Sequence, residues 1–243
     1  MHPLDNVIWQ ALTTRQANFA EVCRMARRFP RDVTSLTAFS KSDSEGYASV
    51  GELVGLAGTA ALFLHEPYRD RPGWELAGGA PLLEMVSENA SSSEHQTNQQ
   101  PGAVELNSQN SAEMVELATL TKPGPFGTRT HELGTYLGIR VDGKLVAMAG
   151  ERLKVPGFTE VSAVCTHPEH TGKGYAASLM VEVMRRIRER GEVPFLHVRQ
   201  DNARAIALYE RLGFRTRMIV HYVVLRSVRE AASPSGAESL SRR

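Results

Sequence analysis

Residues 159–180 read TEVSAVCTHPEHTGKGYAASLM, and this stretch decides the fold of the chain. It begins as an apolar run, passes through a loop with Gly172 and Gly174, and continues with helical spacing of its apolar residues. Glycines let a backbone approach an anion closely, and the first turn of a helix offers unpaired N–H groups at the positive end of its dipole. The stretch therefore predicts a strand, a phosphate-binding turn and a helix.

The segments around this stretch alternate between strand and helix patterns. Upstream, Asp142-Gly143 separates the apolar runs of 135–153, which is typical of a hairpin. Downstream, 194–198 is a short apolar run and 202–212 has the pattern of a helix. This order predicts the α/β fold class, with a mixed sheet that carries helices on its faces.

Composition divides the chain into four parts. Residues 91–102 are dominated by polar residues and predict a linker, and 229–243 predict a disordered tail. The linker separates an N-terminal α/β accessory domain, 1–90, from a C-terminal domain, 103–228.

The N-terminal part shows no catalytic spacing. Apolar residues at Phe19, Val22, Cys23 and Ala26 have helical spacing, so we expect a helix across them. Residues 50–64 predict a helix, a glycine-containing turn and a strand. Two alternatives are open for this part: a degenerate relative of the C-terminal domain, or an unrelated accessory domain.

The composition excludes several classes of protein. With 243 residues, 42% hydrophobic and 23% charged, the chain suits a globular protein, and its net charge of +1 does not favour nucleic acid or an anionic membrane. Two cysteines, Cys23 and Cys165, make no disulfide framework, and no apolar run is long enough to span a membrane. We expect a cytoplasmic protein with no nucleic-acid or membrane partner, either monomeric or homodimeric.

Two motifs in this order resemble the GNAT acyl-CoA N-acyltransferases. Where the family has Arg/Gln-x-x-Gly-x-Gly/Ala, this chain has the loop 171–176, and Asn202 to Phe214 matches Asn-x-x-Ala-x-x-Leu-Tyr-x-x-x-Gly-Phe. With PFLHV between them, they look most like the FR47-like branch, over 103–226. The resemblance implies the GNAT fold and the direct transfer of an acetyl or other short acyl group from acyl-CoA to a primary amine.

The resemblance also implies where acetyl-CoA or another short acyl-CoA would bind as co-substrate. The loop and the following helix would hold the pyrophosphate, and the main chain before the loop would pair with the pantetheine arm. Thr171 departs from the family's Arg or Gln, which removes a long polar side chain. The cofactor-binding residues expected are Val164, Cys165, Thr166, Thr171, Gly172, Lys173, Gly174, Tyr175, Ala176 and Asn202.

Two residues are expected to move protons. Glu160 is the preferred general base, because its place fourteen residues before Gly174 resembles that of the strand glutamate used as base in the histone-acetyltransferase branch. Such a glutamate needs partial burial to raise its pKa, or a water relay to the amine, and Glu151 is the alternative base. Tyr209, on the motif tyrosine, is the preferred general acid. Each has a structural alternative, as a solvent-facing glutamate or a buried packing tyrosine. Phe126 is expected to line the acceptor site.

Other functions are weighed beside this one. Cys165, His167 and His170 have poor spacing for a metal site, so no metal is expected. A non-catalytic acyl-CoA-binding sensor is the main alternative to the enzyme, and a nucleotide-phosphate module is a third class. The acceptor, a small-molecule amine or a protein amino group, does not follow from the sequence.

Overall fold

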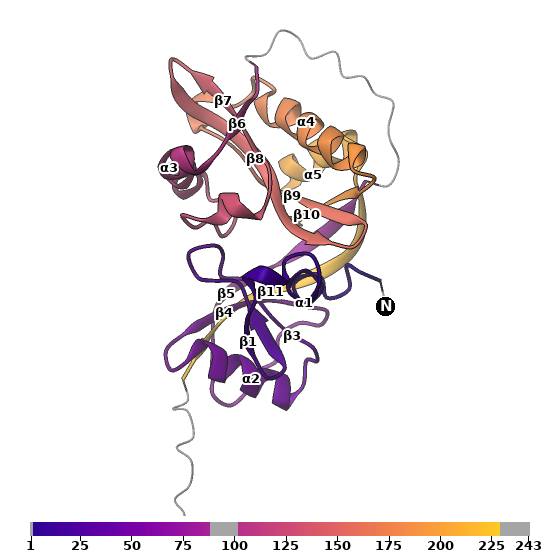
Figure 1. The fold of residues 1–243 in the computed structure, drawn as a ribbon. Helices are drawn as coiled ribbons and strands as arrows, with labels where there is room; N and C mark the ends of the chain where they lie inside the picture. Colours follow the sequence, from indigo (N-terminus) through magenta and orange to yellow (C-terminus); the bar gives the residue numbers. More distant parts are fainter. Residues whose placement is uncertain (1, 88–101, 229–243) are drawn as a thin grey trace, which may run out of the picture.

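The computed structural model describes residues 2–87 and 102–228 (Figure 1), here called the N-terminal and C-terminal halves. The expected tail lies outside the described residues, and so does the expected linker apart from Gly102. None of the described helices is long and apolar enough to cross a membrane. In chain order the elements are α1 (Val7–Thr13), η1 (Ala17–Phe19), β1 (Glu21–Cys23), β2 (Ala26–Arg28), β3 (Thr37–Phe39), α2 (Ser44–Val54), β4 (Thr59–Leu64), β5 (Trp74–Val86), β6 (Val104–Leu106), η2 (Ser108–Asn110), α3 (Ser111–Thr121), η3 (Thr130–Leu133), β7 (Tyr136–Val141), β8 (Lys144–Val155), β9 (Phe158–Thr166), η4 (Pro168–His170), α4 (Tyr175–Glu189), β10 (Val193–Arg199), α5 (Ala203–Arg211) and β11 (Arg215–Ser227).

The C-terminal half confirms the predicted α/β class. Its strands belong to a mixed eight-stranded sheet in the order β4-β11-β5-β10-β9-β8-β7-β6, in which β9 and β10 are parallel and the other paired strands are antiparallel. The predicted hairpin is present as β7 and β8, which pair through Val141 and Lys144 beside the Asp-Gly turn.

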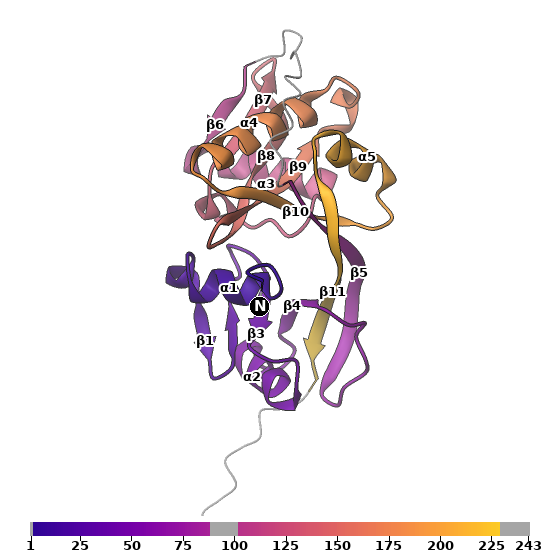
Figure 2. The same cartoon turned by 90° about the vertical axis from the view of Figure 1, so that its right-hand side faces the viewer.

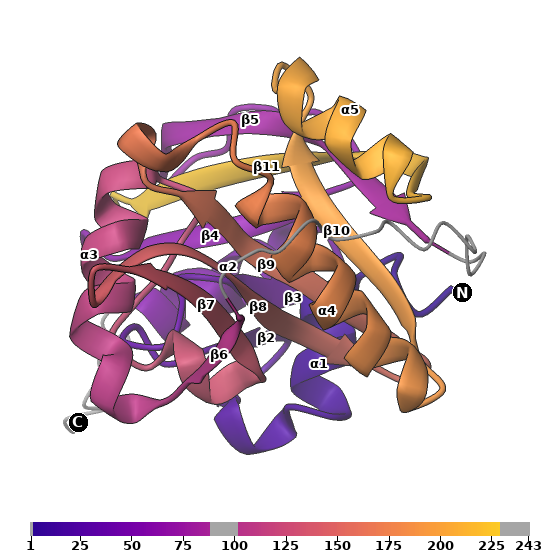
Figure 3. The same ribbon diagram turned by 90° about the horizontal axis from the view of Figure 1, so that it is seen from above.

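Helices cover both faces of this sheet, and the strand residues alternate to match. Ala147 and Ala149 of β8 pack in the core beneath α4, whereas Met148 between them packs in the core beneath α3. Figure 3 shows α3 and α4 on opposite sides of the sheet. Because side chains alternate across a strand, β8 serves both cores and is almost entirely buried.

One predicted element of the N-terminal half is wrong. The helix expected across Phe19 to Ala26 is instead the short hairpin β1–β2, in which Glu21 pairs with Arg28. The turn between the strands contains Arg24 with a φ of 47°, a left-handed conformation that interrupts helical spacing. The predicted helix and strand of residues 50–64 are present as the second part of α2 and as β4.

The two halves share the eight-stranded sheet. Strand β5 comes before the linker, yet it lies between β10 and β11, with Phe195 opposite Val86 on one side and Arg215 opposite Val86 on the other. Beyond this point β5 and β11 run on together into the N-terminal half, where β11 also pairs with β4 (Figure 2). The predicted boundary is thus a change in composition across which the sheet continues.

Strands β9 and β10 diverge, and this divergence creates the space for a site. They pair only from Val193 opposite Phe158 to Phe195 opposite Glu160. Strand β9 then continues to Thr166 and β10 to Arg199 without further pairing to each other. Parallel strands that separate in this way expose backbone groups on both inner edges.

Candidate active site

A cavity of about 930 Å³ lies where β9 and β10 diverge, between the two halves. The C-terminal half contributes the ends of both strands, the start of α5 and the loop after α3, while the N-terminal half contributes side chains from β4, β5 and the segment before β3. Six residues expected at the site line it: Phe126, Val164, Cys165, Thr166, Asn202 and Tyr209.

A bulge in β9 turns the cofactor-side residues toward this cavity. Met148 is opposite Cys165 but Gly150 is opposite Ser162, so β9 has one extra residue here, and Ala163 has a φ of 54°. The expected pairing with a pantetheine arm needs main-chain groups on the edge of β9 that faces β10, and this edge has no β10 partner after Glu160.

The phosphate loop has the backbone form that an anion needs. Gly172 and Gly174 both have φ of 80°, and Gly174 is the N-cap of α4 without a side-chain hydrogen bond to the first turn. The N–H groups at the start of α4 are therefore uncapped, and the helix dipole favours an anion beside them. These residues fit a pyrophosphate.

Thr171 has a local role in this loop. Its hydroxyl donates to the Pro168 carbonyl at 3.1 Å, which closes the turn η4 ahead of the glycines. The Lys173 ammonium lies 3.4 Å from Nδ1 of His170 on the same turn. Thr171 thus stabilises the loop's shape.

Tyr209 lies on the buried face of α5 and reaches the cavity. Its side chain packs beside Phe214, with ring centroids 6.1 Å apart, and burial raises the pKa of the phenol to about 12. Cys165 is close enough to contribute to this shift, and burial likewise raises the pKa of its thiol to about 11. The phenol is protonated at neutral pH, as a general acid must be, and Cys165 has the environment of an inert thiol.

Glu160 has an environment opposite to the one predicted. It is fully buried, and burial alone would raise its pKa, but the charge and hydrogen bonds of Arg152, with those of His197, lower it to about 2. Arg152 donates from Nε at 2.8 Å and Nη2 at 2.7 Å, the Leu153 N–H donates at 3.3 Å, and His197 Nδ1 lies 2.8 Å away. A carboxylate held in this way does not take up a proton at neutral pH.

A second bulge explains why the Glu160 carboxylate accepts so many hydrogen bonds. Glu151 is opposite Val161 but Lys154 is opposite Thr159, so β8 has an extra residue opposite Glu160. This brings Arg152 and the Leu153 N–H to the same carboxylate, which satisfies the irregular backbone.

Glu160 is one member of a ladder of alternating charges across five adjacent strands. His197 on β10 lies 3.4 Å from Glu84 on β5, and Glu84 accepts from Arg217 on β11 at 2.7 Å. Arg217 then pairs with Asp5, which is about a quarter exposed. We call Arg152, Glu160, His197, Glu84, Arg217 and Asp5 the charge ladder.

His197 is the ladder's titrating group on the cavity wall. Its side chain is 2% exposed, and it lies between two carboxylates and beside the rings of Phe63 and Phe195. Burial by itself would lower the pKa of His197, but the hydrogen bonds and charges of Glu160 and Glu84 raise it overall. Nε2 is buried and lies 3.4 Å from Oε2 of Glu84, with no other partner among the described side chains.

Two of the remaining predicted residues differ in outcome. Glu151 does not line the cavity; it pairs with Lys154 at 2.8 Å and Arg190 at 2.7 Å, which makes it a buried structural carboxylate. Phe126 does line it, half-buried with its ring edge-on to Tyr136.

Arg152, His197 and Glu84 were not singled out from the sequence. Each is a charged or titratable residue of a strand; His197 and Glu84 stand between apolar neighbours, whereas Arg152 directly follows Glu151. Buried polar groups need partners, so such positions are a signal of cross-strand ion pairs, but their pairing depends on which strands become neighbours.

The N-terminal half also contains a strand, a helix and a strand in succession, but the start of its helix is capped by a side chain. Strand β3, helix α2 and strand β4 follow one another, and Leu36 forms a parallel bridge with Ala61. However, the Asp43 side chain caps α2 by accepting from the Gly46 N–H, and Glu45 lies in its first turn. An anion would meet negative charge there.

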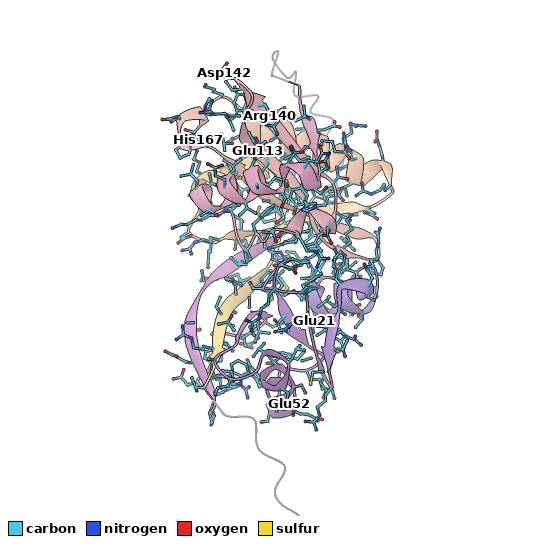
Figure 4. The ribbon with its side chains drawn as sticks, turned by 60° about the vertical axis from the view of Figure 1, so that its left-hand side comes forward. Glu21, Glu52, Glu113, Arg140, Asp142 and His167 are labelled. Carbon is cyan, nitrogen blue, oxygen red and sulfur yellow. The ribbon has the colours of Figure 1, made fainter. Side chains whose placement is uncertain are left out.

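A cluster of possible metal ligands lies directly before the phosphate loop, at η4. Ligand atoms of His167, Glu169 and His170 lie within 4.8 Å of one another, and Cys165 is not among them. His167 Nδ1 accepts from the Glu169 N–H and so helps to close η4. Figure 4 shows His167 at the same end of the molecule as the Glu113–Arg140 ion pair, away from the N-terminal half.

Comparisons with known proteins identify the family of this chain. The FR47-like protein family matches residues 136–224. The N-alpha-acetyltransferase RimI of Mycobacterium tuberculosis is 40% identical over 83 residues, which are 33% of this chain and 51% of that protein. The match therefore spans about half the length of this curated relative.

Solved structures extend the likeness to both halves. The crystal structure of a GNAT-family protein from Novosphingobium aromaticivorans is 37% identical, with a TM-score of 0.85, and the match covers 93% of this chain and 99% of that one. At 17% identity, the GCN5-related N-acetyltransferase from Kribbella flavida has a TM-score of 0.60 over 91% of this chain and 93% of its own, a likeness of fold. A tandem GNAT protein from the clavulanic acid pathway is similar in fold at 13% identity, with a TM-score of 0.51 over 84% of this chain and 78% of its own. This chain belongs to the GNAT superfamily of acetyltransferases, in its FR47-like branch.

Proposed function

We propose that the protein is an N-acyltransferase that moves an acetyl or other short acyl group from acyl-CoA to a primary amine by direct transfer. The observation that carries this proposal is the cavity between β9 and β10, which brings Tyr209, Asn202 and Val164–Thr166 to one space. The uncapped start of α4 supplies the second requirement, a place for the pyrophosphate.

In this proposal, different segments would bind different parts of acyl-CoA. The backbone of 172–176 and the α4 dipole would hold the pyrophosphate, and the bulged end of β9 would pair with the pantetheine arm. Asn202 caps α5 by accepting from the Ala205 N–H at 3.2 Å, and its side chain borders the same cavity. Thr171 keeps the loop closed, so the loop does not depend on a long side chain at that position.

Proton transfer is assigned to His197 and Tyr209. The ammonium of the acceptor loses two protons as it becomes an amide. His197 accepts one through a water, because Nδ1 is bonded to Glu160 and Nε2 is buried beside Glu84, and passes it to solvent. The other replaces the proton that Tyr209 gives to the departing sulfur as the carbon–sulfur bond breaks and the carbon–nitrogen bond forms. Glu160 orients His197 through Nδ1.

The experiment combines calorimetry for acetyl-CoA with a free-thiol release assay over a panel of amines. We expect acetyl-CoA to bind and thiol to be released with at least one amine. Binding without thiol release across a broad panel would instead support a non-catalytic acyl-CoA sensor. Failure to bind acetyl-CoA, with binding of ATP or NAD, would reject both.

We propose that the protein is cytoplasmic and uses no metal. Its acceptor is a small-molecule amine or a protein amino group; RimI, the curated relative, is named as an N-alpha-acetyltransferase, but the match covers only half of that protein.

A further inference from the structure

The cavity wall has an uneven distribution of charge. Among the described residues that line it are four permanent cations and His197, but neither aspartate nor glutamate. The carboxylates of the charge ladder stand behind this wall, where Glu160 and Glu84 are completely buried. The cations are Lys122, Arg152, Arg199 and Arg204.

Two of these cations belong to the cofactor side. Arg199 ends β10 and Arg204 lies in the first turn of α5, so both flank Asn202 and are exposed. Arg199 also pairs with Asp201 at 2.6 Å. We associate these two arginines with the phosphate groups of the donor.

Arg152 occupies a different part of the cavity. Its side chain is 8% exposed, and Nε and Nη2 both donate to Glu160. The third nitrogen, Nη1, lies near the loop after α3, since a Cβ added to Gly124 would be 4.0 Å from it. Glu160 is shared between Arg152 and His197, so one carboxylate serves two basic groups.

Apolar side chains line the same cavity as this arginine. Leu36 and Phe63 come from the N-terminal half, Phe126 from the loop after α3, and the half-buried Tyr222 from β11. A guanidinium within an apolar wall is a typical site for a carboxylate, since the hydrogen bonds to a charged group are strengthened where water is excluded.

We propose that the acceptor is a small amine that carries a carboxylate and an apolar side chain, as a free α-amino acid does, and that Arg152 receives the carboxylate. This inference rests on the proposed function, because the amine must share the cavity with the acyl donor. A peptide N-terminus has an amide in place of this carboxylate and would leave Arg152 without its ligand.

The test compares matched amines on the unaltered full-length protein with acetyl-CoA. L-Leucine is compared with leucinamide and with 3-methylbutylamine, and L-phenylalanine with 2-phenylethylamine; an alanine-starting peptide is included. A charged hydrogen bond predicts that kcat/KM is about tenfold to a hundredfold higher for the carboxylated member of each set. Equal or faster acetylation of the amides, the decarboxylated amines or the peptide would overturn the inference.

Binding measured beside turnover separates this inference from the proposed function. In the presence of CoA, calorimetry should detect leucine more strongly than leucinamide. If thiol is never released but leucine is preferred, the substrate-class inference stands and the transferase proposal fails. If neither compound binds, the inference is overturned.

Variants locate the effect. Because Arg152→Gln alone leaves Glu160 without its charge partner, the test uses Arg152→Gln together with Glu160→Gln, which keeps a neutral buried pair. The double variant should lose the preference for leucine over leucinamide. Arg204→Gln is the matched control: it should alter the KM for acetyl-CoA and leave the preference intact. A double variant that is folded and keeps the preference contradicts the assignment to Arg152.

Discussion

A buried carboxylate acts as a base near neutral pH only if its pKa is raised, and in this protein the raised pKa belongs to a histidine. The sequence predicted that Glu160 would be buried on its strand, but it did not predict that its carboxylate would pair with Arg152 and His197. The opposite charges decide the direction of both shifts, lowering the pKa of Glu160 and raising that of His197.

The pH dependence of turnover should follow His197. A base must be unprotonated, so kcat/KM should rise with pH through the raised pKa, with the acid limb centred above the ordinary value of about 6.5. Glu84→Gln removes one of the two carboxylates that face this ring and should move the limb to lower pH. His197→Gln should abolish the limb and lower turnover about a hundredfold.

The control for this pH profile, Asp5, lies two members beyond Glu84 in the charge ladder. Asp5 contacts Arg217 and not His197, so Asp5→Asn should leave the limb in place. A limb that does not move in Glu84→Gln, in protein that is folded by circular dichroism, would contradict the role of His197.

Tyr209 is expected to act after the amine attacks. Phe keeps the packing against Phe214 but removes the proton donor, so Tyr209→Phe should lower kcat about a hundredfold with a much smaller change in the Kd for acetyl-CoA. Steady-state kinetics and calorimetry measure the two quantities. Unchanged kcat would remove Tyr209 as the acid and leave it as a packing residue.

At the scale of elements, the start of α4 and the start of α2 have opposite electrostatics. Helix α4 follows two glycines and has no side-chain cap, whereas α2 is capped by Asp43 and has Glu45 in its first turn. We therefore expect one acetyl-CoA to bind per chain, at α4, which calorimetric stoichiometry can measure.

A pair of glycine variants tests the phosphate loop against backbone strain in general. Gly172 and Gly55 have φ of 80° and 74°, with no atom within 4 Å of an added Cβ at either position. Alanine should cost about 1 kcal/mol of unfolding free energy at Gly172 and at least as much at Gly55, because a positive φ disfavours a side chain and the ψ of 178° at Gly55 lies in a region almost restricted to glycine. Only Gly172→Ala should also weaken acetyl-CoA binding; equal Kd values for both variants would argue against the loop as the phosphate site.

At the scale of the molecule, the N-terminal half completes the sheet of the C-terminal half. Both neighbours of β11, namely β4 and β5, come from the N-terminal half, and β5 also covers the free edge of β10. Residues 102–228 alone would leave the 13 residues of β11 without a partner. An unpaired strand and exposed edge favour aggregation over folding.

This predicts that residues 102–243 alone will not give a cooperative unfolding transition. Co-expression with residues 1–87 should restore a soluble complex that binds acetyl-CoA. Circular dichroism melts and calorimetry report the two properties. A C-terminal fragment that folds and binds acetyl-CoA by itself would show that β5 is dispensable.

The sequence by itself determined the local features of this protein: the strand, glycine turn and helix of 159–180, the Asp-Gly hairpin, the helix of Tyr209, and the family to which these motifs point. These depend on backbone conformation and on side-chain periodicity within one segment. Helical spacing alone gave a wrong prediction for Phe19 to Ala26, where a left-handed turn at Arg24 makes a hairpin.

Only the tertiary structure decided which charged side chains lie next to one another. Glu84, His197 and Glu160 are distant in sequence but lie on three adjacent strands, because β5 inserts beside β10. A pKa depends on neighbours in space, so the lowered pKa of Glu160 and the raised pKa of His197 could not be predicted from either segment alone.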